Sequence, residues 1–281
     1  MTYVRILNRE EVRAALPMAQ AIEAMKHAFA AYSAGKAQVP LRTHLQIPAH
    51  EGLALFMPAY LAGEEEALTL KAVTVYARNP EQGLPLIHAG VLVLDPRTGQ
   101  VQGLLEGGTL TAIRTGAASG AATDVLARTD SRVLAVFGAG VQARTQIEAV
   151  CTVRPIERVW VYDLDRKRAE DLAAELAGQG PIPADIRVAA TPQQAVADAD
   201  VICTATTSST PVFRDQDLKP GVHINGIGSY TPAMAEIPPE TIRRALVVVD
   251  AREAALAEAG DIIQAIQQGL ITPLHIHAEL G

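Results

Sequence analysis

The sequence is poor in aromatic residues, cysteine and positive charge, and each shortage excludes a class of protein. Aromatic residues make up 4% of the chain and the formal net charge is −7, so neither a basic cluster nor a row of aromatic rings is available to bind a nucleic acid. The two cysteines, Cys151 and Cys203, lie far apart in apolar stretches. This placement indicates buried, reduced thiols in a reducing compartment.

Long apolar runs are also missing. No stretch approaches the roughly 18 apolar residues of a membrane span, and the N-terminal MTYVRILNREEV lacks the apolar core of a signal peptide. We therefore expect a cytoplasmic protein that binds neither membrane nor nucleic acid. His275 and His277 alternate near the end without an evident third ligand, so no metal site is predicted.

What the sequence does contain is enough apolar material for two cores, since 49% of its 281 residues are hydrophobic. Its first third mixes helix and strand. In residues 18–36, apolar residues recur every three or four positions, which predicts a helix that ends near Gly35. LTLKAVTVY (68–76) predicts a strand. LIHAGVLVLDPRTGQVQGLLE (86–106) predicts a hairpin, and hence an antiparallel or mixed sheet.

After Gly108 the pattern changes to an alanine-rich helix followed by alternating strands and helices. RVLAVFG, ERVWVYD, DVICTA and ALVVVD are predicted strands, and VQARTQIEAV and DRKRAEDLAAELA are predicted helices. This order predicts an α/β fold with a Rossmann-type, doubly wound parallel sheet. We expect a dinucleotide-binding domain over residues 112–255, flanked by a second α+β domain formed by residues 1–111 and part of 256–281.

A glycine-rich turn in FGAGVQAR indicates the dinucleotide. Gly138 permits the tight turn, Gly140 lets a pyrophosphate approach the backbone, and Ala143 lets the helix pack closely on the strand. The free N–H groups at the start of the helix then bind the anion. Asp163 ends the next strand, where an acid binds a ribose and favours NAD(H). Two arginines shortly after Asp163 leave NADP(H) open as well.

Three cations stand out against apolar or small neighbours: Arg42 in VPLRTHLQIP, Lys71 in LTLKAVTV and Arg114 in LTAIRTGAAS. A lysine in a strand most often lies on its wet face, and an arginine in a helix is most often solvated. Taken together, the three cations could also converge on a small carboxylate, which arginine binds through two hydrogen bonds. Spacing in the sequence leaves both interpretations open.

Five longer segments resemble the ornithine cyclodeaminase/mu-crystallin family, and the resemblance extends over nearly the whole chain. They are GLPLIHAGVLVLDPRTGQVQGLLEGGTLTAIRTGAASGAA, VFGAGVQAR, CTATTSSTPVF, LKPGVHINGIGS and VVVDAREAALAEAGD. The resemblance implies a Rossmann domain joined to a substrate-binding and dimerisation domain, a homodimer, NAD(H) or NADP(H) as cofactor, and a small amino or imino acid as substrate. The family usually continues past the point that matches HAELG, which leaves the size of the substrate domain open.

The resemblance also implies roles for individual residues. Arg42, Lys71 and Arg114 match the family's carboxylate-binding cations. The residues that match its cofactor contacts are Thr115, Gly138, Ala139, Gly140, Val141, Gln142, Asp163, Thr204, Ser208 and Ser229.

Three departures concern the substrate. The family's cyclodeaminases have a glutamate, a threonine and an aspartate where this chain has Leu55, Leu86 and Tyr230. Each change removes a group suited to a charged diamine, and an ammonium group buried without a partner is strongly unfavourable. The pattern GSYTP-x-M-x-E resembles the branch that reduces Δ1-pyrroline-2-carboxylate or Δ1-piperideine-2-carboxylate to L-proline or L-pipecolate. Leu55, Leu86 and Met57 would then line the ring.

Two residues are candidate catalytic acids: Lys71, whose pKa we expect burial near two arginines to lower, and Tyr230 through its hydroxyl group. Two other functions stay open. One is a cyclodeaminase or an enzyme like alanine dehydrogenase, which would release or consume ammonia. The other is a non-catalytic, mu-crystallin-like protein that binds NADPH and a ligand.

Overall fold

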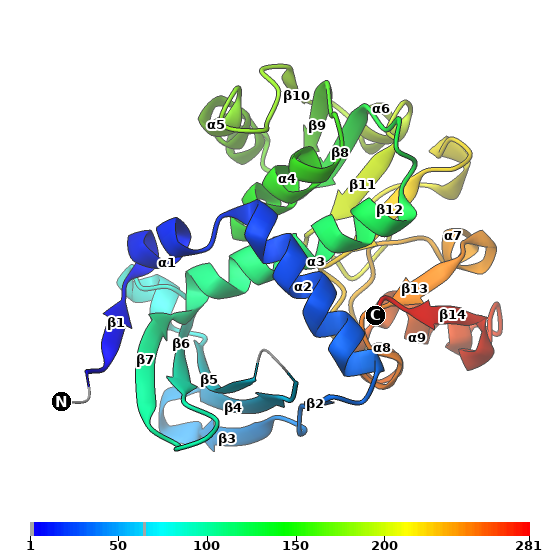
Figure 1. Cartoon of the computed structure of the whole chain (residues 1–281). Helices are drawn as coiled ribbons and strands as arrows, with labels where there is room; N and C mark the ends of the chain where they lie inside the picture. Colours follow the sequence, from blue (N-terminus) through cyan, green and yellow to red (C-terminus); the bar gives the residue numbers. More distant parts are fainter. Residues whose placement is uncertain (1–2, 64–65) are drawn as a thin grey trace. The chain divides into compact units, whose positions relative to one another are not determined.

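The structure is a computed structural model that describes residues 3–63 and 66–281 (Figure 1). Contacts within the chain divide it into two compact units. Unit 1 comprises Met1–Gln20, His27–Arg114 and Gly281, and unit 2 comprises Ala21–Lys26 and Thr115–Leu280. The sequence placed part of residues 256–281 in the first domain, whereas the contacts assign residues up to Leu280 to unit 2. The functional roles of the two domains stay predictions.

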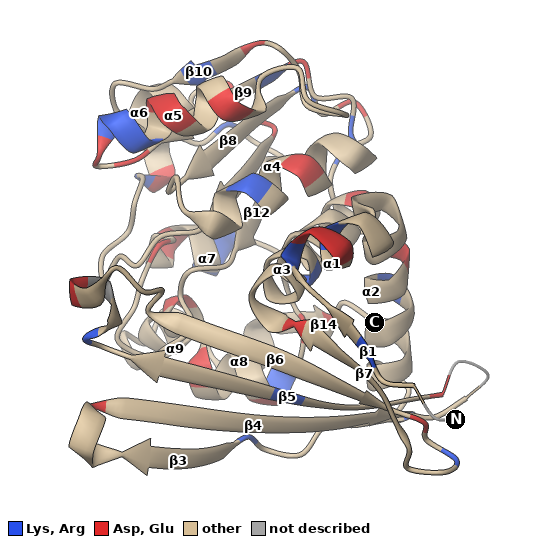
Figure 2. Ribbon diagram, turned by 90° about the vertical axis from the view of Figure 1, so that its left-hand side faces the viewer, with Lys and Arg blue, Asp and Glu red and all other residues tan. Residues whose placement is uncertain are grey.

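Unit 1 contains a seven-stranded mixed sheet. Its strands are β1 (Arg5–Leu7), β2 (Ala37–Gln38), β3 (Thr43–Ile47), β4 (Gly52–Leu61), β5 (Ala67–Tyr76), β6 (Ile87–Leu94) and β7 (Val101–Glu106). Their order is β1-β7-β6-β5-β4-β2, and β3 also pairs with β4. β1 runs parallel to β7 and the remaining pairs are antiparallel, which confirms the mixed sheet and the β6–β7 hairpin. Figure 2 shows few charged residues along β4, β5 and β6.

The helices near the N-terminus follow from local signals. α1 (Arg9–Ala15) begins with a capping box, in which the Asn8 side chain accepts from Glu11 N and the Glu11 side chain accepts from Asn8 N. α2 (Met18–Ser33) is the helix predicted from the apolar spacing, and Gly35 after it has φ +71°. α3 (Gly107–Leu126) begins in unit 1 and continues into unit 2. Short 3-10 turns cover Pro48–His50 and Asn79–Gln82.

Unit 2 contains the parallel sheet that the sequence predicted. Its five strands lie in the order β10-β9-β8-β11-β12, and every pair is parallel. They are β8 (Val133–Phe137), β9 (Arg158–Tyr162), β10 (Ile186–Val188), β11 (Val201–Thr204) and β12 (His223–Gly226). The connecting helices are α4 (Val141–Val153), α5 (Arg166–Leu176) and α6 (Pro192–Val196).

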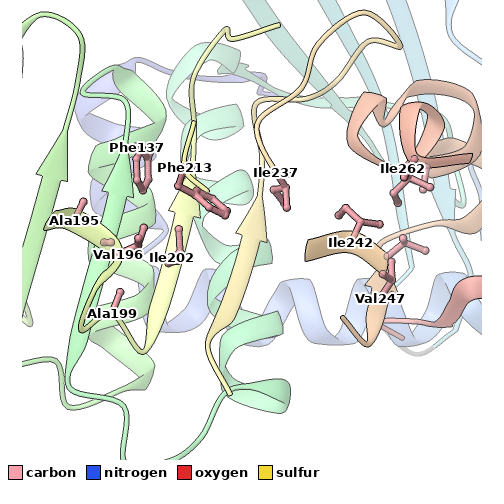
Figure 3. Close-up of a cluster of buried hydrophobic side chains, with 14 of the residues drawn as sticks. Phe137, Ala195, Val196, Ala199, Ile202, Phe213, Ile237, Ile242, Val247 and Ile262 are labelled. Atoms are coloured by element: carbon pink, nitrogen blue, oxygen red, sulfur yellow. The ribbon is translucent and has the colours of Figure 1, made fainter. Parts of the chain in front are cut away.

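Apolar side chains cover both faces of this sheet, as a doubly wound fold requires. One buried cluster joins β8 and β9 to α4 and α5 and includes both cysteines, which are free and buried as predicted. The other cluster joins the opposite face to α6 and Phe213, and it continues to Ile242, Val247 and Ile262 (Figure 3).

One predicted strand belongs to a different sheet. The run ALVVVD forms β13 (Val247–Val249), but β13 pairs with β14 (Ile276–Glu279) in a separate two-stranded sheet. Its placement in the five-stranded sheet was therefore wrong. The apolar side chains of β13 are buried against residues of α7 (Pro239–Arg244) and α9 (Gly260–Gln267), so apolarity alone did not identify its partner strand. α8 (Arg252–Glu258) precedes α9, and short 3-10 turns cover Asp215–Asp217 and Pro273–His275.

Candidate active site

A row of residues across the sheet of unit 1 surrounds Lys71. In the β-ladders, Lys71 pairs with Met57 on β4 and with Val91 on β6. Residues that face each other across strands project from the same side of a sheet, as do residues two apart along a strand. Leu55, Met57 and Lys71 therefore share one face, and Val91 beside them is buried. The sheet thus brings together three of the predicted substrate residues.

The other two predicted carboxylate-binding cations, Arg42 and Arg114, also belong to unit 1. Arg42 directly precedes β3, and the pair Thr43–Phe56 puts Arg42 opposite Met57 if the register continues by one residue. Arg114 lies on the unit 1 part of α3, close enough to Lys71 to act on its charge. Both arginines are exposed and both have interactions within the chain. The arrangement offers positive charge to a small anion at this face.

Lys71 has an unusual acidity. Burial of its amine, with a smaller contribution from the charge of Arg114, lowers the pKa of Lys71 from 10.5 to about 8. This confirms the expected direction and makes desolvation the main cause. At pH 7 the amine is still a cation in a ratio of roughly ten to one. Lys71 is therefore both charged and able to release a proton.

Two predicted substrate residues lie elsewhere. Leu86 precedes β6 and lies opposite Tyr76, because the Leu86 carbonyl accepts from Tyr76 N at 3.0 Å. Tyr76 is five residues after Lys71 on β5, so Tyr76 and Leu86 project from the other face of the sheet. Tyr230 belongs to unit 2 and is 62% exposed. It lies on the loop after β12, where Tyr230 N donates to Gly228 O at 3.0 Å. The roles of both side chains stay predictions.

The glycine-rich turn of unit 2 has the geometry of an anion site. Gly138 has φ +94°, and a Cβ there would lie 2.6 Å from Ala205 O, so only glycine fits. Asp163 Oδ2 accepts from Ala139 N at 2.7 Å, which fixes the acid against the turn. Gly140 is the N-cap of α4 and supplies no side-chain acceptor to the first N–H groups of the helix. An anion such as a pyrophosphate suits these donors.

Two buried polar atoms at the carboxyl ends of the parallel strands, near the glycine-rich turn, also indicate a polar ligand. Gln142 Oε1 at the start of α4 and Thr204 Oγ1 at the end of β11 are buried without a hydrogen-bond partner in the described part of the chain. Such atoms are normally satisfied, and a dinucleotide carries both donors and acceptors. Thr115 lies on α3 and is partly buried. The residues present therefore fit an NAD(H) or NADP(H) group, while their individual contacts stay predictions.

The hydroxyl groups of the two predicted serines are partly engaged. Ser208 Oγ donates to Thr210 O at 2.6 Å, and Ser229 Oγ donates to Met234 O at 3.0 Å while it accepts from Asp261 N at 3.0 Å. Ser208 Oγ also accepts from Thr210 N at 3.1 Å. Each hydroxyl has a single proton, which is already donated, so toward a further group either serine can act only as an acceptor.

Comparison with known protein families shows which family this chain is related to. The model described as the ornithine cyclodeaminase/mu-crystallin family matches residues 4–281. The chain belongs to this family. Its relatives include a Δ1-pyrroline-2-carboxylate reductase of Bacillus cereus, 40% identical over 277 residues that span 98% of this chain and 84% of that protein.

Two solved structures of the family are similar in fold. One is the Δ1-pyrroline-2-carboxylate reductase of Thermococcus litoralis in complex with NADH and L-proline, with a TM-score of 0.91 and 42% identity over 99% of this chain and 85% of that one. The other is an archaeal alanine dehydrogenase dimer with bound NAD, with a TM-score of 0.88 and 34% identity over 99% of this chain and 83% of that one. They confirm the predicted fold class.

Two residues beside the predicted cofactor loops, Glu236 and Asp261, became important only with the structure. The Glu236 side chain accepts hydrogen bonds from two separate loops, at Thr206 and at Gly228. Asp261 was not predicted to have a role. Its only sequence signal is an acid directly after a glycine at the start of an apolar helix, which is a common pattern.

Among the residues that the structure describes, no helix is long and apolar enough to cross a membrane. The cytoplasmic location stays a prediction.

Proposed function

We propose that this protein reduces a cyclic imino acid that carries a 2-carboxylate, using NADH or NADPH. The substrate would be Δ1-pyrroline-2-carboxylate or Δ1-piperideine-2-carboxylate, and the product L-proline or L-pipecolate. The observation that carries the proposal is a partly buried lysine of lowered pKa beside Arg114, on a sheet face that also bears Leu55 and Met57. The bacterial and archaeal reductases described above support it, because they cover almost the whole chain.

The cations of unit 1 bind the substrate carboxylate. Arg42 and Arg114 each offer a planar guanidinium group, which matches the two oxygens of a carboxylate. Leu55 and Met57 contact the saturated ring and exclude water. They offer no partner for a second ammonium group, which disfavours ornithine.

Lys71 then supplies the proton to the imine nitrogen. A pKa of about 8 keeps the amine protonated at neutral pH yet makes it a better acid than an ordinary lysine. The proton moves from Nζ to the substrate nitrogen, and Lys71 is reprotonated from solvent. Tyr230 is the second candidate donor. A bound reduced nicotinamide supplies the hydride for the ring carbon.

Unit 2 holds the dinucleotide. The Gly138–Gln142 turn and the start of α4 bind the pyrophosphate, and Asp163 binds the adenosine ribose. Thr115, Thr204, Ser208 and Ser229 complete the contacts that the family pattern assigns. An acid at position 163 favours NAD(H), and NADP(H) remains an alternative.

The protein acts as a homodimer in this proposal. The support is an apolar row on the sheet face opposite to Lys71, where Ile6, Leu104, Leu92 and Leu70 face one another across four strands. Ile6 is 72% exposed and Leu104 41% exposed. The archaeal alanine dehydrogenase, a relative at 34% identity, is a dimer.

The test is an assay of the purified protein with Δ1-pyrroline-2-carboxylate and NADH or NADPH, followed by the loss of reduced-nicotinamide absorbance. We expect oxidation of one or both cofactors and formation of L-proline without release of ammonia. A parallel sample with L-ornithine and NAD+ is assayed for ammonia. Ammonia and proline from ornithine would identify a cyclodeaminase instead. Tight binding of NADPH without turnover of either substrate would identify a binding protein.

A further inference from the structure

Two loops of unit 2 leave the same edge of the parallel sheet. β11 ends at Thr204 and β12 ends at Gly226, and the two strands are parallel neighbours. Thr206 lies on the loop after β11, and Gly228 lies on the loop after β12. Ligands of open parallel sheets bind at the carboxyl ends of the strands, so both loops border the predicted dinucleotide site.

A buried carboxylate ties these loops together. Glu236 Oε1 accepts from Thr206 N at 2.6 Å and from Thr206 Oγ1 at 2.7 Å, and Glu236 Oε2 accepts from Gly228 N at 2.6 Å. Glu236 is fully buried, with an exposed fraction of 0%. Hydrogen bonds to an ionised acceptor are stronger than neutral ones. The side chain therefore sets the distance between the loops.

The backbone is shaped around this carboxylate. A Cβ at Gly228 would lie 2.6 Å from Glu236 Cδ and would overlap Thr206 O. A short parallel bridge joins Ser209 to Ala235, and Ala235 N donates to Ser208 O at 3.0 Å. The two loops and the segment before Glu236 thus form one closed arrangement.

A second buried carboxylate holds the first in place. Asp261 Oδ1 accepts from Glu236 N at 2.7 Å and from Ile237 N at 3.0 Å. Asp261 N donates to Ser229 Oγ, which in turn donates to Met234 O, both at 3.0 Å. The Ser229 hydroxyl is thereby oriented with a lone pair left over for a donor. Burial of Asp261, together with the nearby charge of Glu236, raises the pKa of Asp261 to about 6.

We propose that Glu236 and Asp261 are positioning residues of the dinucleotide site. They fix Thr206, Gly228 and Ser229 in the arrangement that receives the cofactor, and they do so through hydrogen bonds to those residues. This inference rests on the cofactor binding included in the proposed function. In this arrangement the two buried carboxylates hold the loop after β11 and the loop after β12 at a fixed distance from each other.

The first test is a fluorescence titration of NADH into the wild-type protein and into Glu236→Gln. The amide nitrogen of glutamine is a donor, so it opposes either Thr206 N–H or Gly228 N–H. We expect the Kd for NADH to rise about tenfold or more. In turnover, the KM for NADH rises by a similar factor while kcat falls much less. A variant that binds NADH as tightly as the wild type would overturn the inference.

Asp261 offers a conservative rescue. Asp261→Asn keeps the Oδ1 acceptor for Glu236 N and Ile237 N, so we expect its Kd for NADH to stay within about twofold of the wild type. Asp261→Ala removes the acceptor, and its Kd should rise about tenfold. Equal affinities for the two variants would contradict a positioning role. Thr206→Val is the milder variant if Glu236→Gln does not fold, because it leaves the Glu236 carboxylate in place and removes only the Thr206 hydroxyl, which donates to Glu236 and accepts from Ser208 N. Its Kd for NADH should rise as well, and an unchanged Kd would count against the inference.

Asp200→Asn is the matched control. Asp200 is also a buried carboxylate that accepts from two backbone N–H groups, those of Arg132 and Val133, but they lie at the amino end of β8. It should lower thermal stability and leave the Kd for NADH unchanged. Loss of NADH binding in this control would mean that general destabilisation explains the result, and would overturn the inference. A wild type that binds NADH but reduces no imine would refute the proposed function and leave the inference standing.

Discussion

At the scale of single residues, Lys71 is the most informative side chain. The sequence identified it as a cation in an apolar strand but could not choose between a wet face and a binding site. The choice depends on register, because the pairing of Lys71 with Met57 and Val91 puts it on a face where Val91 is buried. Register is set by contacts between strands, so a single strand does not contain that information.

The acidity of Lys71 gives a pH-dependent prediction. The protonated amine is the active form, so kcat/KM for the imine should be constant below the pKa of about 8 and fall as pH rises through it. Lys71→Met removes the proton donor and should lower kcat by about 10²- to 10⁴-fold at pH 7. The measurement is kcat and kcat/KM for imine reduction as a function of pH in both proteins.

Lys71→Arg separates charge from acidity. It keeps the positive charge for the carboxylate, but a guanidinium group does not lose its proton in this range. We therefore expect a KM for the imine close to that of the wild type, a low kcat, and no fall in kcat/KM near pH 8. Undiminished imine reduction by Lys71→Met would exclude Lys71 as the donor and leave Tyr230 as the candidate.

Asp261 shows where reading the sequence fails at this scale. Asp163 ends a predicted strand after a glycine-rich turn, so local context predicted a cofactor contact for it. Asp261 lies on a later helix and acts on Glu236 and Ser229, which are distant in sequence. Its role is made by tertiary contacts alone.

At the scale of elements, the sequence predicted the hairpin and the alternating strands and helices, because neighbouring residues specify both. The β6–β7 hairpin turns where the Asp95 carboxylate accepts from Arg97 N and Thr98 N, and the alternation of strands and helices gave the parallel sheet. The sequence placed β13 in the wrong sheet, because a run of three valines predicts a buried strand but does not specify which strand it pairs with.

The C-terminus of α3 depends on one side chain that lies outside it. Arg154 is 6% exposed, and its Nη2 donates to Thr123 O, Asp124 O and Ala127 O at 2.8–3.0 Å. Thr123 and Asp124 lie in the last turn of the helix and Ala127 directly follows it, where carbonyl groups have no further helical turn to bond. Thr123 O also accepts from Ala127 N at 3.0 Å. Arg154→Met would leave the three carbonyl groups buried without this donor. We expect a loss of about 3 kcal/mol of unfolding free energy, measured as a lower urea midpoint.

Arg158→Met is the comparison for that experiment. Arg158 forms ion pairs with Asp185 and Asp198, but its side chain is 33% exposed. Solvent weakens such pairs, so the loss should be much smaller than that for Arg154→Met. A similar loss in both variants would contradict the capping role of Arg154.

At the scale of the whole molecule, the main question is what covers the apolar side of the sheet in unit 1. Ile6, Leu104, Leu92, Leu70 and Pro58 face one another across five strands. Ile6, Leu104 and Pro58 are exposed, whereas Leu92 and Leu70 are partly buried. Exposed apolar residues that lie side by side are typical of an interface. The sequence implied a homodimer only through the family resemblance, since which apolar residues share this face follows from the register of the strands.

If this side of the sheet is the interface of a homodimer, a charge within it should separate the subunits. Leu104→Glu would bury a carboxylate without a partner in the dimer, whereas in the monomer the same side chain stays in water. We expect the wild type to have the mass of a dimer in size-exclusion chromatography with light scattering, and Leu104→Glu to have the mass of a monomer. Leu274→Glu is the control, because Leu274 is 91% exposed and belongs to unit 2; it should remain a dimer. A monomeric wild type, or a variant that keeps its dimer, would exclude this face as the interface.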